Sequence, residues 1–161
     1  MSIPELQGCE AVTLEEMLDA REKRVLRQQK LFQKYGGTLI CLTLNIAGPY
    51  KMFPLALQTF REAILQISER LSAEHTAIHH FEKQIRKTGA EAFFCVQKDA
   101  CILKQWMTEL EEFCPLGRLW DIDVLKEDGT KVSRRDIGYP ERRCFICSQP
   151  AAECARSRAH S

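Results

Sequence analysis

Residues 117–124 read Gly-Arg-Leu-Trp-Asp-Ile-Asp-Val, a glycine turn followed by apolar residues that alternate with acidic ones. A period of two is typical of a β-strand, because successive side chains on a strand point to opposite faces. Asp121 and Asp123 therefore share one face, roughly 6.5–7 Å apart along the strand. Trp120, Ile122 and Val124 share the other face. The pattern predicts a strand whose apolar face is buried and whose acidic face reaches solvent.

Two neighbouring carboxylates repel each other, and partial burial raises a pKa unless a positive charge lies between them. A hard cation such as Mg²⁺, held by one or two carboxylates and by substrate phosphates, meets that condition. An exposed strand face with two solvated aspartates fits the same spacing. From the residues alone, both interpretations of Asp121 and Asp123 stay open.

The segment after this strand contains Asp128-Gly129, the strongest short signal of a hairpin turn. With a two-residue turn, Asp123 faces Arg134 across the hairpin. Arg135 then points the other way, and one extra residue at the turn would exchange the two arginines. We treat them as a pair that forms either a cross-strand ion pair or a cationic clamp on a phosphate.

Length and composition favour one ordinary globular domain. The chain has 161 residues, 45% of them hydrophobic and 28% charged, with a net charge of +1. This balance gives no general attraction to nucleic acid or to membranes. No apolar run reaches transmembrane length, and the start lacks the layout of a signal peptide. We therefore expect a cytoplasmic protein whose eight cysteines are mostly reduced.

The apolar periodicity predicts an α+β fold, a mixed β-sheet with helices packed on it. Helices are expected over about 13–34, 54–73 and 99–112, and strands over 38–46 and 92–97. Residues 76–86 fit either a strand or a short helix. The single domain 1–161 would then comprise the helix 13–34, an α/β core over 38–136 and an irregular, cysteine-rich tail over 137–161.

The tail carries Cys144, Cys147, Cys154 and His160 at close spacing. Three thiols and an imidazole are a ligand set for structural zinc, which would tether a segment with few apolar groups. Reduced thiols packed under the hairpin, or pairing of Cys144 with Cys147 on oxidation, are the alternatives. The spacing between Cys147 and Cys154 is shorter than in common zinc fingers.

Lys51 follows Gly48-Pro49 at the carboxyl end of the first expected strand and precedes a helix. Ligands of α/β proteins tend to bind at such strand ends, and a lysine there can meet a phosphate. A solvated loop lysine is the alternative. Arg61, in the following helix, is a weaker candidate of the same kind.

Three strings together resemble one family. They are residues 115–124, the Ser-Arg-Arg-Asp segment 133–136, and the stretch from Arg142 to His160. They resemble the apo-citrate lyase phosphoribosyl-dephospho-CoA transferases, with a looser match at 48–51 and over 15–24. Members of that family continue past the histidine with another amphipathic helix. Because this sequence ends at Ser161, we expect that packing element to be absent from it.

The resemblance implies a reaction of the nucleotidyl-transfer type. A serine on the acyl carrier protein, the gamma subunit of citrate lyase, attacks 2′-(5″-triphosphoribosyl)-3′-dephospho-CoA and releases diphosphate. The glycine turn and Asp-x-Asp are also similar to a nucleotidyltransferase signature, which implies a fold of that kind. Asp121 and Asp123 would then be catalytic and bind Mg²⁺. Phosphate-binding and ordering roles would go to the remaining matched residues: Lys51, Gly117, Arg118, Arg134 and Arg135.

Two alternatives stay open from the sequence. The first is a non-catalytic module in which the tail is a zinc knuckle and the acidic strand face docks a basic partner. The second is the same chemistry on another carrier protein, such as that of malonate decarboxylase. Glu109 and Glu111 precede the glycine turn, and either could supply a third carboxylate.

Overall fold

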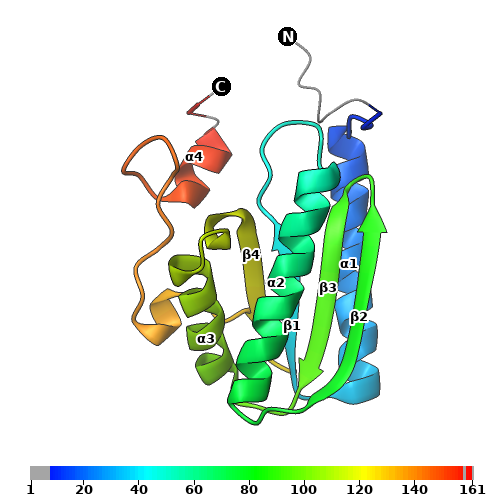
Figure 1. The fold of residues 1–161 in the computed structure, drawn as a ribbon, viewed down its shortest axis with the longest axis vertical. Helices are drawn as coiled ribbons and strands as arrows, with labels where there is room; N and C mark the ends of the chain where they lie inside the picture. The colour runs from blue at the N-terminus through cyan, green and yellow to red at the C-terminus, as the bar shows by residue number, and fades with distance from the viewer. Residues whose placement is uncertain (1–7, 158, 161) are drawn as a thin grey trace.

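The computed structural model describes residues 8–157 and 159–160. Figure 1 shows the elements, which are α1 (Leu14–Tyr35), β1 (Thr38–Leu44), α2 (Pro54–Ala73), β2 (Ile78–Arg86), β3 (Gly89–Val96), α3 (Ala100–Phe113), β4 (Trp120–Leu125) and α4 (Ala151–Ser157). The 3-10 turns η2 (Gly117–Leu119) and η3 (Arg135–Ile137) precede and follow β4 along the chain. The helices expected over 13–34, 54–73 and 99–112 and the strands expected over 38–46 and 92–97 are confirmed to within a few residues, and the ambiguous segment 76–86 is mostly strand. The tail, expected to be irregular, contains the short helix α4.

Local signals account for the helix boundaries. Thr13 and Glu16 form a reciprocal capping box at the start of α1, which ends at Gly36 with a positive φ of 60°. Pro54 occupies the first turn of α2, where its missing N–H costs nothing. The Asp99 side chain caps α3 by accepting the backbone N–H groups of Cys101 and Ile102.

The four strands form one sheet in the order β2-β3-β1-β4, and all three pairings are antiparallel. The α+β class is confirmed, but the mixed sheet predicted from alternating strands and helices is wrong. The helices α2 and α3 each connect two strands that run in the same direction, with a third strand inserted between them. This is the split βαβ arrangement, and the nucleotidyltransferase-like fold stays a prediction.

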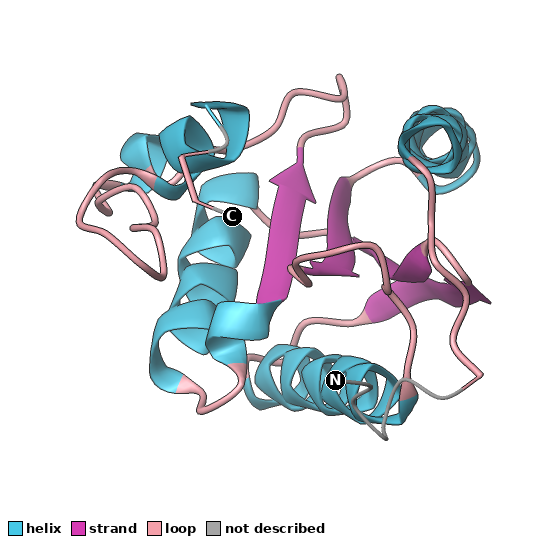
Figure 2. Cartoon of the chain, turned by 90° about the horizontal axis from the view of Figure 1, so that it is seen from above, coloured by secondary structure: helices cyan, strands magenta, loops and turns pink. Residues whose placement is uncertain are grey.

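Helices cover both faces of the sheet, as Figure 2 shows from above. The larger core lies between the sheet and the pair α2 and α3, and a smaller core lies under α1. Alternate residues of β1 enter the two cores: Ile40 and Leu42 face the larger one, and Leu39 and Cys41 the smaller. This double burial confirms β1 as a central strand.

The second hairpin strand predicted after β4 is absent from the described chain. The turn has three residues, 127–129, with Gly129 at φ +81°, and the backbone N–H of Lys126 donates to the carbonyl of Thr130. Pairing stops after the isolated bridge between Leu125 and Lys131 and one further bond from Val132 to Val124. Ser133 and Asp136 then cap each other's backbone N–H groups, which turns the chain into η3. None of the helices in the described ranges is long and apolar enough to cross a lipid bilayer.

Candidate functional site

The two aspartates of β4 lie on the face predicted from their spacing. Trp120, Ile122 and Val124 are buried in the larger core, so Asp121 and Asp123 point to the opposite face. The Asp123 carboxylate accepts a 2.7 Å hydrogen bond from Lys131 Nζ. The Asp121 carboxylate forms no hydrogen bond or ion pair with any of the residues described.

Asp121 is short of positive charge. Desolvation raises the pKa of its carboxyl above the usual range, and the neighbouring Asp123 and Glu111 raise it further. Arg142 and Lys131 oppose this effect only in part. An unpaired carboxylate beside a second acid fits a hard cation, since that ion would supply the missing charge. The donor set at Asp121 and Asp123 therefore fits Mg²⁺.

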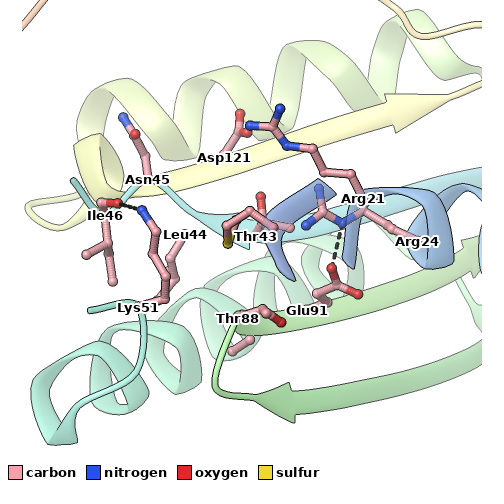
Figure 3. Close-up of a pocket in the computed structure, with 13 residues that line it drawn as sticks. Arg21, Arg24, Thr43, Leu44, Asn45, Ile46, Lys51, Thr88, Glu91 and Asp121 are labelled. Carbon is pink, nitrogen blue, oxygen red and sulfur yellow. Dashed lines mark hydrogen bonds and ion pairs between the residues drawn. The ribbon is translucent and has the colours of Figure 1, made fainter. Parts of the chain in front are cut away.

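A hollow of about 210 Å³, here called the cationic hollow, opens beside Asp121. Figure 3 shows Arg21 and Arg24 entering it from α1, with Lys51 entering from the loop after β1. Asp121 and Asn45 lie at its margin, on β4 and just beyond the end of β1. The hollow is large enough for a chain of phosphates and too small for a whole coenzyme A derivative.

The cations of this hollow are only partly neutralised. Arg24 pairs with Glu91 at 2.6 Å, and Lys51 Nζ donates to the carbonyl of Ile46 at 2.5 Å. Burial lowers the pKa of Lys51, and the positive charge of Arg21 lowers it further. Two cations that disfavour each other across a hollow would both be stabilised by a bound anion.

A second hollow of about 450 Å³ lies next to the first and shares Asn45 and Asp121 with it. We call it the tail hollow, because Ala151, Ala152 and Ala155 of α4 line one of its sides. Its other lining residues include Lys104, Glu111, Arg134 and Arg142. Asp121 therefore stands between a hollow bounded by α1 and one bounded by the tail.

Glu111 is the centre of the charges under the tail hollow. Its buried side chain, 3% exposed, forms ion pairs with both Arg134 and Arg142. Its other oxygen accepts the backbone N–H of Ile122, and Lys104 Nζ donates to the Ile122 carbonyl at 2.9 Å. Two side chains of α3 thus hold the backbone between the two aspartates.

The structure corrects several predicted positions. Arg134 does not face Asp123, because the three-residue turn and η3 carry it to Glu111 and Glu112 on α3, where it lines the tail hollow. Lys131, which lies opposite Leu125, pairs with Asp123 in place of the predicted arginine. Arg135 is 75% exposed and lines neither hollow, although its partner Glu141 lines the tail hollow.

Gly117 and Arg118 also lie outside the two hollows. Gly117 is buried against the end of α3, where an added Cβ would lie 2.4 Å from the Glu111 carbonyl oxygen. Arg118 donates to the carbonyl of Arg143 at 2.8 Å, and its guanidinium lies over the Phe145 ring. Gly117 therefore allows the chain to pack against α3 before the acidic strand, and Arg118 holds the tail through Arg143 and Phe145.

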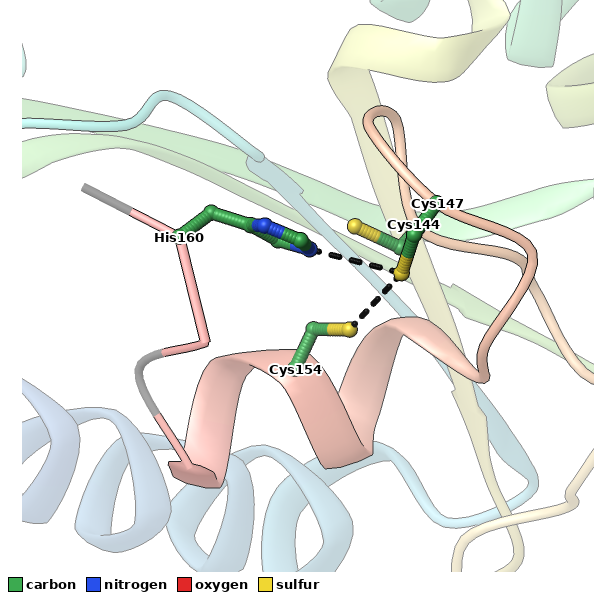
Figure 4. Close-up of side chains that lie close together, drawn as sticks. All are labelled: Cys144, Cys147, Cys154 and His160. Carbon is green, nitrogen blue, oxygen red and sulfur yellow. Dashed lines mark hydrogen bonds between the residues drawn. The ribbon is translucent and has the colours of Figure 1, made fainter.

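The four predicted tail ligands converge, as Figure 4 shows. One ligand atom from each of Cys144, Cys147, Cys154 and His160 lies within 4.8 Å of all the others. Cys147 Sγ lies 3.4 Å from Cys154 Sγ and 3.3 Å from His160 Nε2. The cluster could hold a metal ion such as zinc.

Sequence reasoning missed several residues of the site. Arg21 and Arg24 follow Met17 at helical spacing, and all three line the cationic hollow. Both arginines belong to the looser family pattern over 15–24, so a signal for them existed. Arg142 was noted only as part of a matched string. The position of Asn45 depends on the pairing of β1 with β4, which no local signal reveals.

Comparison with known proteins decides the family. Residues 12–161 match the family model described as apo-citrate lyase phosphoribosyl-dephospho-CoA transferase. The chain belongs to this family. Its tail is part of the match, and so are α1 with Arg21 and Arg24 and the β4 aspartates.

Individual members of the transferase family are similar over most of the chain. The apo-citrate lyase phosphoribosyl-dephospho-CoA transferase of Escherichia coli O6:K15:H31 is 34% identical over 158 residues, covering 98% of this chain and 86% of the relative. Protein CitXG of Haemophilus influenzae is 39% identical over 150 residues, which are 92% of this chain. The matched region is 32% of CitXG, so the chain spans about a third of that relative's length.

Proposed function

We propose that this chain attaches the prosthetic group of citrate lyase. It would transfer 2′-(5″-triphosphoribosyl)-3′-dephospho-CoA to a serine of the citrate lyase acyl carrier protein, with release of diphosphate. Membership of the transferase family supports the reaction class. The single structural observation that carries the assignment to this site is the unpaired Asp121 carboxylate at the margin of the cationic hollow.

The covalent change is a substitution at phosphorus. The serine oxygen forms a bond to the innermost phosphorus, the bond from that phosphorus to the bridging oxygen breaks, and diphosphate leaves with the bonding electrons. The serine proton must go to a base. We assign this role to one of the two aspartates, acting together with the bound cation.

Cations of the site would bind the phosphates. Arg21 and Lys51 line the cationic hollow. Burial and the charge of Arg21 lower the pKa of Lys51, and an anion bound in the hollow would stabilise the charged lysine. Arg134 and Arg142 are committed to Glu111, so we assign them to positioning the β4 backbone. Asp121 and Asp123 would hold Mg²⁺, which when bound neutralises phosphate charge and stabilises the leaving diphosphate.

The non-catalytic docking module is not favoured, because the matching relatives are named as transferases. The same chemistry on a different carrier protein remains the second candidate, and the assay below separates the two carriers. A cytoplasmic location and a structural zinc ion in the tail complete the proposal. The zinc ion is argued in the next subsection.

The test is a mass-shift assay. Apo citrate lyase carrier protein, incubated with enzyme, cofactor and Mg²⁺, should gain the prosthetic-group mass on one serine. Asp121→Asn and Asp123→Asn should each lower the turnover rate by at least about 100-fold. Asp19→Asn, on the exposed surface of α1, is the control and should keep normal turnover. Near-normal transfer by either site variant would disprove the assigned roles.

A parallel reaction with the malonate decarboxylase carrier tests the second candidate. Labelling of that carrier with equal efficiency would contradict the assignment to citrate lyase alone. Labelling of neither carrier, with correctly folded protein and authentic cofactor, would contradict the transfer reaction itself.

A further inference from the structure

We propose that Cys144, Cys147, Cys154 and His160 hold one structural zinc ion that fastens the tail as the wall of the tail hollow. The ion would lie outside the reaction and would act by positioning Arg142. The zinc site stands on its own geometry. Only its effect on transfer rests on the proposed function.

The spacing of the four ligand atoms suits a small tetrahedral site. Zinc–sulfur bonds of about 2.3 Å place tetrahedral ligands about 3.8 Å apart. Cys147 Sγ lies 3.4 Å from Cys154 Sγ and 3.3 Å from His160 Nε2, and no two of the four ligand atoms are more than 4.8 Å apart, so the separations span the value expected for zinc. Thiolate and imidazole ligands select zinc over the oxygen-seeking Mg²⁺ and Ca²⁺.

A disulfide explains this convergence less well. All three cysteines are free, and the 3.4 Å between Cys147 Sγ and Cys154 Sγ far exceeds a disulfide bond of about 2.05 Å. Any disulfide would use two sulfurs and leave a third thiol and the His160 ring gathered for no reason. A metal ion uses all four groups. The backbone N–H of Ile146 also donates to Cys144 Sγ at 3.4 Å, as suits a thiolate.

Apolar burial contributes little to holding the tail in place. The helix α4 has seven residues, none of them buried, and a helix of that length is not stable alone. Phe145 and Ile146, between the first two ligands, are 61% and 69% exposed. A segment with so little apolar burial needs a cross-link, and a metal bound by four ligands supplies one.

The cluster is joined directly to the site through Arg142. This residue lies two positions before Cys144, and its carbonyl accepts the backbone N–H of Ala151 at the start of α4. Its guanidinium donates to the Trp120 carbonyl at 2.9 Å and pairs with Glu111 at 2.8 Å. Ordering of the tail by zinc would therefore fix the arginine that holds the backbone next to Asp121.

The first experiment measures metal. Full-length protein purified under reducing conditions should contain about one zinc ion per chain by mass spectrometry of the metal. Cobalt substitution should give the absorption bands of a tetrahedral thiolate site. Cys154→Ser should lose most of the metal, whereas Cys101→Ser, at an exposed free cysteine of α3, should retain it. Absence of zinc, failure of the wild-type protein to bind cobalt, or an intramolecular disulfide under these conditions would overturn the proposal.

The second experiment measures order in the tail. Arg143 and Arg156 are exposed, but an ordered backbone resists trypsin; removal of zinc by a chelator should therefore permit cleavage after both residues, while the far-ultraviolet circular dichroism of the remaining fold stays the same. Return of zinc should restore protection. A tail that stays protected without zinc would disprove the fastening role. These readouts do not use the transfer reaction, so a failure of the proposed function would leave them unchanged.

The link to the site has its own readout. If zinc acts through Arg142, the zinc-free protein and Arg142→Lys should show a similar loss of turnover, about tenfold by analogy with other supporting contacts. Loss of transfer in Cys154→Ser with full zinc content would contradict the link, and so would full transfer in the zinc-free protein.

Discussion

The buried carboxylate of Glu111 accepts a 2.8 Å hydrogen bond from the backbone N–H of Ile122, the residue between the two aspartates of β4. Its second oxygen binds Arg134 and Arg142, so one side chain pairs with two guanidinium groups and also holds the strand backbone. A carboxylate chosen from sequence as a candidate ligand thus has a different role. We propose that Glu111 positions the strand that carries the two aspartates.

Glu111→Gln is expected to destabilise the fold strongly. The amide keeps a hydrogen-bond acceptor for Ile122, but it removes the ion-pair partner of Arg142 and leaves Arg134 with Glu112 alone, at a cost of about 3 kcal/mol in the free energy of unfolding. Urea unfolding measures the change. Glu112→Gln is the control: Glu112 is 39% exposed, so its pair with Arg134 contributes less than about 1 kcal/mol. Equal losses in the two variants would contradict the central role of Glu111.

Asp121→Asn is expected to raise stability slightly while it removes activity. Folding raises the pKa of Asp121 above its unfolded value of about 3.9. The contribution of this group to the free energy of unfolding is therefore complete only below that pH, and it is lost as pH rises through the higher pKa of the folded state. Asparagine has no such loss. The gain of the variant should therefore grow from acid toward neutral pH and then level off, below about 1 kcal/mol because the side chain reaches solvent. Thermal melting across pH measures this gain. A variant that becomes less stable than the wild type from acid toward neutral pH would refute a raised pKa for Asp121.

Lys51→Met is expected to weaken cofactor binding. The loss of one charged hydrogen bond to a phosphate should raise KM about tenfold with less effect on kcat. Lys83→Met, at an exposed site on β2 in the outer strand of the sheet, serves as the control. Burial and Arg21 lower the pKa of Lys51, so the lysine loses its charge, and wild-type KM rises, at a less alkaline pH than for an ordinary lysine. Lys51→Arg should remove that rise, because arginine stays charged. An unchanged KM in Lys51→Met would exclude phosphate contact.

Gly117→Ala tests why glycine precedes the acidic strand. A methyl group there would lie 2.4 and 2.5 Å from the carbonyl oxygens of Glu111 and Leu110, so η2 must move away from α3. We expect a loss of about 2 kcal/mol in the free energy of unfolding. Gly48→Ala is the comparison, since Gly48 has open space around it and only its φ of +78° disfavours alanine, by about 1 kcal/mol. A milder effect at Gly117 than at Gly48 would argue against close packing.

The sequence predicted whatever depended on short-range patterns. The alternation from Trp120 to Val124 placed Asp121 and Asp123 on one face, and the capping box at Thr13 and the proline at 54 located two helices. Spacing alone also grouped the four tail ligands, because they lie within 17 residues of one another. In each case the signal and the structure it specifies belong to the same stretch of chain.

The errors came from long-range pairing and from one turn. The insertion of β1 between β3 and β4 brings α1 and its arginines toward Asp121, and no local pattern encodes that order. At the hairpin, a single additional residue in the turn placed Lys131 opposite Leu125, from where its side chain, in place of that of Arg134, pairs with Asp123. The mutual capping of Ser133 and Asp136 then ended the strand early.

The bonds that Glu111, Lys104 and Arg142 make to the backbone of β4 also limit how another protein can bind at this edge of the sheet. They occupy the main-chain groups of Trp120 and Ile122 that a fifth strand would need at this margin of the sheet. Within the described chain, β2 is the other outermost strand, and it pairs on one side only. A carrier protein approaching the aspartates must therefore be recognised through side chains, whereas recognition by strand addition has room only at β2.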